Sequence, residues 1–292
     1  MSPTRAYPAR TGDGVRIVLH RLEPRAPRHT TPVLLVAGTF STRTFWLGTR
    51  GQGFGRFLAE AGFDIWILEP RGHGASERPS SWTLEDWIRQ DAPAALDRVL
   101  ATTGAPDCFW VGHSAGGVVG AAAVGACPQL AARLRGLVLI GAPGPVGVSG
   151  LRRWVARSGH LAAGLFPRVA VPGTLLGLGP EPEPTPLIRQ WMGWNLQGAW
   201  RGSDGGDYLD ALDAVEVPLL ALAGAGDRWL APPEAVRDLA RRFGSEDRTL
   251  VLAGTRQGFR EEYGHAELIV SRNARQEIWP LLRDWLEARA GE

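Results

Sequence analysis

The chain has 292 residues, of which 44% are hydrophobic and 21% charged, and these proportions are typical of a globular protein, not of a disordered chain or a coiled coil. Its length allows one large α/β domain or two small ones. The formal net charge of +2 and the scattered arginines argue against a nucleic-acid partner. All 32 basic residues are arginine, so neither a Schiff-base lysine nor a P-loop lysine is available.

The N-terminal residues lack the apolar segment of a signal peptide. The two cysteines, Cys108 and Cys127, are too few for a metal site and are typical of buried thiols in a reducing compartment. Residues 161–179 are apolar, but an arginine and two prolines interrupt them, which favours a cap over a membrane span. We therefore expect a cytoplasmic protein with no stable membrane insertion, no metal and no cofactor; the oligomeric state stays open.

The first half of the chain alternates strand and helix patterns. Residues 7–22 predict an antiparallel hairpin around the sequence GDG. Residues 32–38 and 63–70 are apolar runs typical of strands buried on both faces, and residues 54–62 between them predict a helix. A long helix is expected over residues 81–104, with Ser81 or Thr83 as its N-cap and Gly104 as its end.

The alternation continues with a strand at 108–112, a turn at Ser114, a helix to about Cys127 and a strand at 134–143. Residues 144–210 break the pattern: they contain helical fragments at 151–166 and 186–200 but no convincing buried strand, and predict a cap or lid. Strands at 217–224 and 248–254 then alternate with helices at 232–243 and 273–290. The pattern predicts an α/β fold with a doubly wound, mostly parallel sheet, formed by residues 1–143 and 211–292, and an inserted helical cap.

Ser114 lies in the sequence GHSAG, between a buried strand and a helix, with a glycine two residues away on each side. A serine at such a turn projects its hydroxyl from the sheet edge, and the helix N-terminus offers N–H groups to a developing anion. Because the chain is rich in glycine, the motif needs supporting residues.

A nucleophilic serine needs a histidine base. His265, in the loop between the last strand and the last helix, is the best placed of the six histidines to reach it. His73, in the sequence RGHG, more commonly organises a turn, and His113 adjoins the serine but its side chain is expected to point elsewhere. The base needs an orienting carboxylate, and Asp227 follows the strand at 217–224, whereas the preceding strand is followed by no acid.

The order Ser114, Asp227, His265 resembles that of the α/β-hydrolase triad, and the whole chain is similar to an esterase- or lipase-like α/β-hydrolase, although no family motif is assigned to the cap. The resemblance implies an oxyanion hole formed by the backbone N–H groups of Ala115 and of Thr39, or otherwise Phe40. At this loop the family commonly has His-Gly, where this sequence has Ala37-Gly38.

We therefore expect a serine hydrolase that cleaves a small apolar carboxylic ester through an acyl-enzyme intermediate. Thioesterase, carbon–carbon bond hydrolase and acyltransferase activities share this triad and stay open, as does a non-catalytic ligand-binding role. The residues expected to contact the substrate are Phe40, His113, Trp191, Trp194 and Trp229.

Overall fold

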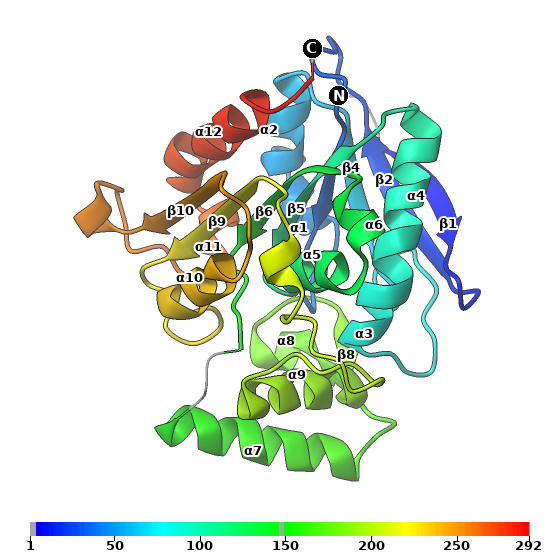
Figure 1. The fold of residues 1–292 in the computed structure, drawn as a ribbon, viewed down its shortest axis with the longest axis vertical. Helices are drawn as coiled ribbons and strands as arrows, with labels where there is room; N and C mark the ends of the chain where they lie inside the picture. The colour runs from blue at the N-terminus through cyan, green and yellow to red at the C-terminus, as the bar shows by residue number, and fades with distance from the viewer. Residues whose placement is uncertain (1–3, 146–148, 292) are drawn as a thin grey trace.

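The computed structural model describes residues 4–145 and 149–291; residues 1–3, 146–148 and 292 of the predicted core and cap lie outside that description. Within the described residues an eight-stranded sheet has the order β1-β2-β4-β3-β5-β6-β9-β10 (Figure 1). Its strands are β1 (Arg5–Arg10), β2 (Arg16–Leu22), β3 (Val33–Val36), β4 (Ile65–Glu69), β5 (Cys108–His113), β6 (Leu134–Ile140), β9 (Leu219–Gly224) and β10 (Arg248–Ala253).

The strands from β4 to β10 in this order pair in parallel, and only the β1–β2 and β2–β4 pairs are antiparallel. Val36 at the end of β3 pairs with Gly112 of β5, and His113 pairs with Ile140 at the end of β6. The loops after β3, β5 and β6 therefore leave the sheet at one edge, where functional groups of such folds gather. The predicted fold class is confirmed.

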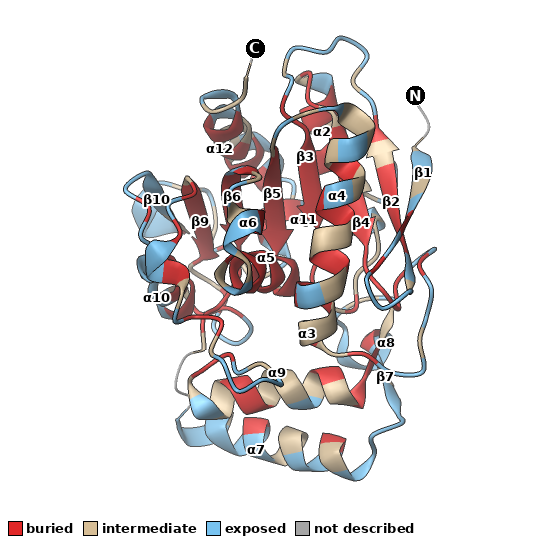
Figure 2. Ribbon diagram, turned by 45° about the vertical axis from the view of Figure 1, so that its right-hand side comes forward, coloured by how far each residue is buried: buried red, intermediate tan, exposed pale blue. Residues whose placement is uncertain are grey.

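Helices cover both faces of the sheet (Figure 1). One face carries α1 (Thr44–Leu47), α2 (Phe54–Glu60), α11 (Glu267–Val270) and α12 (Ala274–Glu287), and the other carries α4 (Ala92–Thr103), α5 (Ala115–Ala126), α6 (Pro128–Ala131) and α10 (Pro233–Arg241). Leu58 of α2 and Leu282 of α12 belong to one buried apolar cluster, and Val118 of α5 and Leu239 of α10 belong to another. Figure 2 shows that the central strands are buried on both faces, as their continuous apolar sequences predict.

The helix expected over residues 81–104 is interrupted. It consists of α3 (Leu84–Asp86), a π-helical turn η1 (Trp87–Asp91) and α4, which ends at Gly104. Thr83 is its N-cap, in a capping box with Asp86. Pro93 explains the interruption, because a proline lacks the N–H that would bond to the carbonyl one turn earlier.

Between β6 and β9 the chain forms a separate group of elements, which we call the insertion (residues 149–210). It contains α7 (Gly150–Leu165), β7 (Ala170–Pro172), α8 (Gly173–Leu176), β8 (Pro182–Pro184) and α9 (Thr185–Gln197), and it lies beyond one edge of the sheet (Figure 1). The prediction that this segment has no buried strand is wrong, because β7 and β8 pair and Glu183 of β8 is buried. Each of these strands is only three residues long and contains proline, so its sequence does not predict a strand. Contacts with the core hold β8 in its extended conformation.

Candidate active site

Ser114 stands at a strained turn between β5 and α5. Its φ of 54° lies in the left-handed region, which in the described residues only Phe40 shares among non-glycine residues. A Cβ added to Gly116 would lie 2.2 Å from the Val36 carbonyl oxygen, and one added to Gly38 would lie 2.8 Å from the Ser114 Cβ. The glycines are therefore required by close backbone contacts, and the crowded turn holds the serine at the sheet edge.

Asp227 and His265 meet in the loops that follow β9 and β10. The Gly226 N–H donates to the Tyr263 carbonyl at 2.9 Å, which joins the two loops. The His265 Nδ1 then lies 2.5 Å from the Asp227 Oδ2. The backbone N–H groups of Leu230 and Ala231 each donate to one oxygen of the same carboxylate at 3.1 Å.

These contacts set the charge of Asp227. Burial alone would raise the pKa of this carboxyl, but the hydrogen bonds from His265 and the two backbone N–H groups lower it below its usual range. Asp227 is therefore an anion at neutral pH, and the His265 Nδ1 is the donor in their hydrogen bond. The imidazole is fixed in the tautomer that leaves Nε2 free to accept a proton.

His113 supports His265 from the side. Its ring centroid is 4.7 Å from that of His265, and its Nε2 donates to the His265 backbone carbonyl at 3.1 Å. Burial, with a further contribution from His265, lowers the pKa of His113 to about 3, so the ring is neutral. Nε2 must then carry the proton, and the side chain anchors the backbone of the His265 loop.

Thr39, in the loop after β3, and Ala115, the first residue of α5, both line the cavity. The backbone N–H of neither residue has a protein acceptor within residues 4–145 and 149–291. The alternative donor, Phe40, is occupied, because its N–H donates to the Glu183 Oε1 at 3.0 Å. Of the two candidates in the sequence AGTF, the geometry therefore favours Thr39 as the oxyanion donor.

Glu183 joins the insertion to this loop through a buried polar cluster. Its Oε1 accepts hydrogen bonds from Phe40 N–H and from His73 Nε2 at 2.9 Å, and its Oε2 accepts one from Trp82 Nε1 at 3.2 Å. The other ring nitrogen of His73 donates to the Ser41 carbonyl at 2.8 Å. Both ring nitrogens of His73 thus face acceptors.

The charge of His73 follows from that pairing. Burial disfavours its charged form, yet the adjacent Glu183 carboxylate raises the pKa of His73 above the ordinary value for histidine. The result is a buried ion pair that holds the loop after β3, which contains Thr39 and Phe40 and which we call the candidate oxyanion loop. His73 therefore has a structural role next to the site, as its turn sequence predicts. The sequence did not indicate that Glu183 would be its partner.

The candidate cavity has a volume of about 390 Å³ and lies between the sheet edge and the insertion. Ser114 and His265 both line it, together with Thr39, Ala115, Phe40 and His113. The insertion contributes apolar side chains from α8, the loop after it and α9, namely Leu176, Leu178, Leu187, Ile188, Trp191 and Met192. No carboxylate side chain of the described residues lines it, so the cavity suits an uncharged, apolar group.

Two of the tryptophans expected at the substrate lie elsewhere. Trp194 is buried on the other side of α9, where its ring packs against Trp200 and Tyr208. Trp229 is exposed, with the Arg152 guanidinium 5.6 Å from its ring centroid. Trp191 does line the cavity, because successive helical positions point to different sides and only one of the α9 tryptophans faces the sheet edge.

Comparison with known proteins finds similarity to hydrolases. A family model described as serine aminopeptidase, S33, matches residues 48–190. A putative lysosomal acid lipase/cholesteryl ester hydrolase of Crotalus adamanteus is 30% identical over 149 residues, which cover 46% of this chain and 37% of the relative. The chain thus spans less than two fifths of the length of the curated relatives it matches.

Solved structures match over nearly the full chain. A thermophilic esterase of Thermogutta terrifontis superposes with a TM-score of 0.62 at 21% identity, covering 98% of this chain and all of the esterase. A monoacylglycerol lipase of Paleococcus ferrophilus gives a TM-score of 0.66 at 16% identity, covering 93% of this chain and 99% of the lipase. The chain has the α/β-hydrolase fold. Its sequence and fold are similar to those of esterases and lipases.

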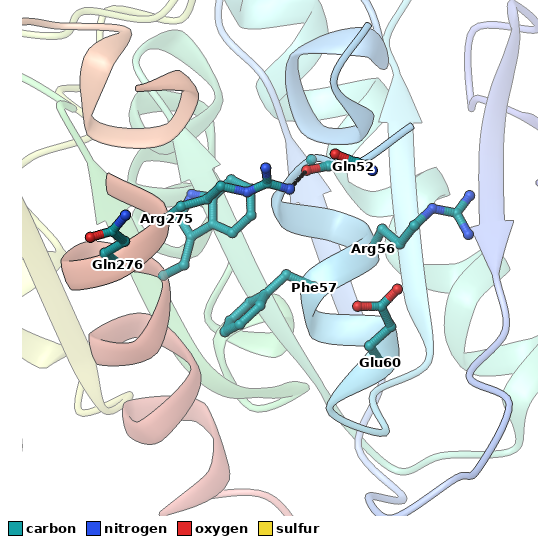
Figure 3. Close-up of a pocket in the computed structure, with 8 residues that line it drawn as sticks. Gln52, Arg56, Phe57, Glu60, Arg275 and Gln276 are labelled. Carbon is teal, nitrogen blue, oxygen red and sulfur yellow. Dashed lines mark hydrogen bonds between the residues drawn. The ribbon is translucent and has the colours of Figure 1, made fainter. Parts of the chain in front are cut away.

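A second hollow, about 440 Å³ in volume, lies between α2 and α12 (Figure 3). Arg275 crosses it, donating to the Gln52 carbonyl at 2.6 Å with its guanidinium over the Trp279 ring. None of Ser114, Asp227 and His265 lines this hollow. It therefore belongs to the packing of the two helices and not to the candidate site.

Further features of the described residues concern metal ions, membranes and the cysteines. Among the described residues, no group of three or more histidine, cysteine or acidic side chains is placed to bind a metal ion. No helix in the described ranges is long and apolar enough to cross a bilayer. Cys108 is a buried free thiol, whereas Cys127 is partly exposed because it follows the last turn of α5.

Proposed function

We propose that this α/β-hydrolase is a serine hydrolase that cleaves apolar carboxylic esters, with Ser114, His265 and Asp227 as its catalytic triad. One observation carries the proposal: a strained serine at the β5–α5 turn shares a cavity with a histidine whose other ring nitrogen is bonded to a buried carboxylate. The lipase and esterase relatives support the same class of activity.

The proposed reaction begins when the Ser114 Oγ forms a bond to the ester carbonyl carbon and its proton moves to the His265 Nε2. Asp227 stabilises the imidazolium, and the Thr39 and Ala115 N–H groups donate to the carbonyl oxygen as it becomes an anion. The tetrahedral intermediate then expels the alcohol, which takes the proton from His265. Water attacks the acyl-enzyme by the same route and releases the acid.

The lining of the cavity bears on the substrate class. An aminopeptidase must hold the ammonium group of its substrate, and burying such a charge without an anionic partner is costly. Among the residues that the structure describes, none places a carboxylate in the cavity for this purpose, while the insertion supplies leucine, isoleucine, methionine and tryptophan. We therefore propose an apolar acyl or aromatic ester as the substrate and the insertion as the cap that shapes its pocket.

The test combines a fluorophosphonate probe with turnover of p-nitrophenyl esters of increasing acyl length. We expect covalent labelling and ester turnover in the wild type and neither in Ser114→Ala, since losing a triad nucleophile costs on the order of 10⁶ in kcat. Ser158→Ala, which removes a serine from α7, is the matched control and should behave as the wild type. A wild-type protein that takes no label would favour the non-catalytic binding role.

A parallel panel of thioesters, and of alcohols offered as acyl acceptors, separates the neighbouring activities. Turnover of thioesters above that of oxygen esters would assign a thioesterase. Transfer to an alcohol in preference to water would assign an acyltransferase.

A further inference from the structure

Helix α7 of the insertion places its large apolar residues on the outside. Leu151, Trp154, Leu161 and Leu165 are spaced by three, seven and four residues, which puts them on one side of a helix. Between 58% and 76% of each residue is exposed. Figure 2 shows α7 as the outermost helix of the molecule, with much of its surface open to solvent.

The opposite side of α7 consists of small residues that pack on α9. Ala156 and Ala163 are buried, and a Cβ at Gly159 would lie 3.6 Å from the Met192 side chain. The His160 Nδ1 is 3.0 Å from the Arg189 carbonyl oxygen. Because a surface helix of a soluble protein normally buries its large apolar residues, this reversed arrangement indicates a partner outside the chain.

The apolar surface extends from α7 to the candidate cavity. Leu175, Leu176 and Leu178 are exposed in and after α8, and the last two also line the cavity. Phe166 and Val169, between the two helices, are exposed as well. We call these residues, with the outer side of α7, the apolar cap surface.

The charged residues between positions 108 and 180 are all arginines. The sequence contains no aspartate or glutamate from residue 108 to residue 180, whereas the insertion carries Arg152, Arg153, Arg157 and Arg168 in that stretch. Arg153 and Arg157 are exposed and one turn apart on α7. Neither they nor Arg168 form an ion pair within residues 4–145 and 149–291.

We propose that the apolar cap surface docks on an anionic lipid surface, with α7 lying in the interface plane. A helix with leucine and tryptophan on one side and arginine beside them binds membranes in this way, through apolar burial and attraction to anionic headgroups. A second copy of the chain fits less well, because a two-fold contact would bring the same unpaired arginines face to face. Docking would turn the mouth of the cavity toward the lipid.

Flotation of the full chain with vesicles tests the docking separately from the activity. The Ser114→Ala protein should float with vesicles of mixed phosphatidylcholine and phosphatidylglycerol, bind pure phosphatidylcholine vesicles more weakly, and lose binding as salt screens the arginines. Arg153→Gln with Arg157→Gln should weaken binding roughly thirtyfold, since each arginine near an anionic surface contributes about a factor of five. Arg237→Gln with Arg241→Gln, on α10, is the charge-matched control and should bind unchanged.

The apolar part is tested by Leu165→Gln, which should weaken vesicle binding, against Leu250→Gln on the edge strand β10, which should not. In an otherwise wild-type chain, none of these changes should alter turnover of a soluble ester. Equal binding of anionic and neutral vesicles would overturn the proposal. So would a concentration-dependent dimer that Leu165→Gln dissociates, because the surface would then be a contact between two copies.

Discussion

Glu183→Gln tests whether the insertion positions the candidate oxyanion loop. The Glu183 carboxylate accepts three hydrogen bonds, from Phe40 N–H, His73 Nε2 and Trp82 Nε1. A glutamine has one oxygen acceptor and one NH₂ donor at the same place. Whichever way the amide turns, at least one of the three donors faces another donor, and His73 loses its counter-ion.

The expected loss of stability follows from burial. Breaking a buried ion pair by removing one charge costs about 3–5 kcal/mol. For a chain of this size that corresponds to a Tm lower by roughly 10 °C. A thermal melt of the purified variant measures it.

The expected loss of activity follows from the backbone. Phe40, with a φ of 62°, is held on both sides by the segment around β8: its N–H donates to Glu183, and its carbonyl accepts from the Glu181 N–H at 3.0 Å. Releasing the Phe40 N–H frees the adjacent Thr39 N–H from its fixed direction. Loss of one oxyanion donor costs about 10²–10³ in kcat, so we expect a decrease in that range with a smaller change in KM.

The assay is steady-state ester turnover well below the Tm of the variant, with Glu181→Gln as the control. Glu181 precedes β8, and its side chain pairs with Arg78 and accepts from the Gly74 N–H, with no hydrogen bond to His73, Trp82 or the Phe40 N–H. Its substitution makes the same change of charge and should leave kcat near the wild-type value. A folded Glu183→Gln protein with a lowered Tm and an unchanged kcat would refute the positioning argument. The carboxylate would then stabilise the insertion without positioning the loop that contains Thr39.

Three further changes probe the site and its support. Gly38→Ala places a Cβ 2.8 Å from the Ser114 Cβ, so kcat should fall about 10²-fold with a stability loss of about 1–3 kcal/mol; unchanged turnover would show that the turn can relax. Asp227→Asn should lower kcat by about 10⁴, since an amide cannot hold the His265 tautomer and also accept from two backbone N–H groups; a loss below tenfold would contradict this role. Glu69 is buried, which disfavours its ionised form, but its bonds to His20, the Ala75 N–H and Arg43 lower the pKa to about 2, so Glu69→Gln should cost stability at neutral pH. Because the folded pKa lies below the unfolded one, the difference in free energy of unfolding between the wild type and Glu69→Gln should shrink as the pH falls from about 5 to about 2. Chemical denaturation at several pH values measures this difference, and a value that does not change with pH would contradict the prediction.

The sequence was sufficient to predict the sheet, the order of its elements and the places of Ser114, Asp227 and His265. Buried parallel strands have continuous apolar sequences, and the residues after them must meet at one edge of the sheet, so local patterns carry that information. Only part of the crowding around Ser114 is local: Gly112 is crowded by the Gly116 carbonyl oxygen of the same turn, whereas the carbonyl oxygen that crowds Gly116 belongs to Val36 of β3.

Contacts between distant segments were decided by the tertiary structure alone. Glu183 lies 143 residues from Phe40 and 110 from His73, in a proline-rich stretch with no strand signal, so nothing in the sequence pairs them. The choice of Thr39 over Phe40 depends on that pairing, because the Phe40 N–H is already bonded. The outward face of α7 is likewise decided by packing: the sequence shows an amphipathic helix, but only the fold shows that α9 contacts its small residues and leaves its large apolar ones exposed.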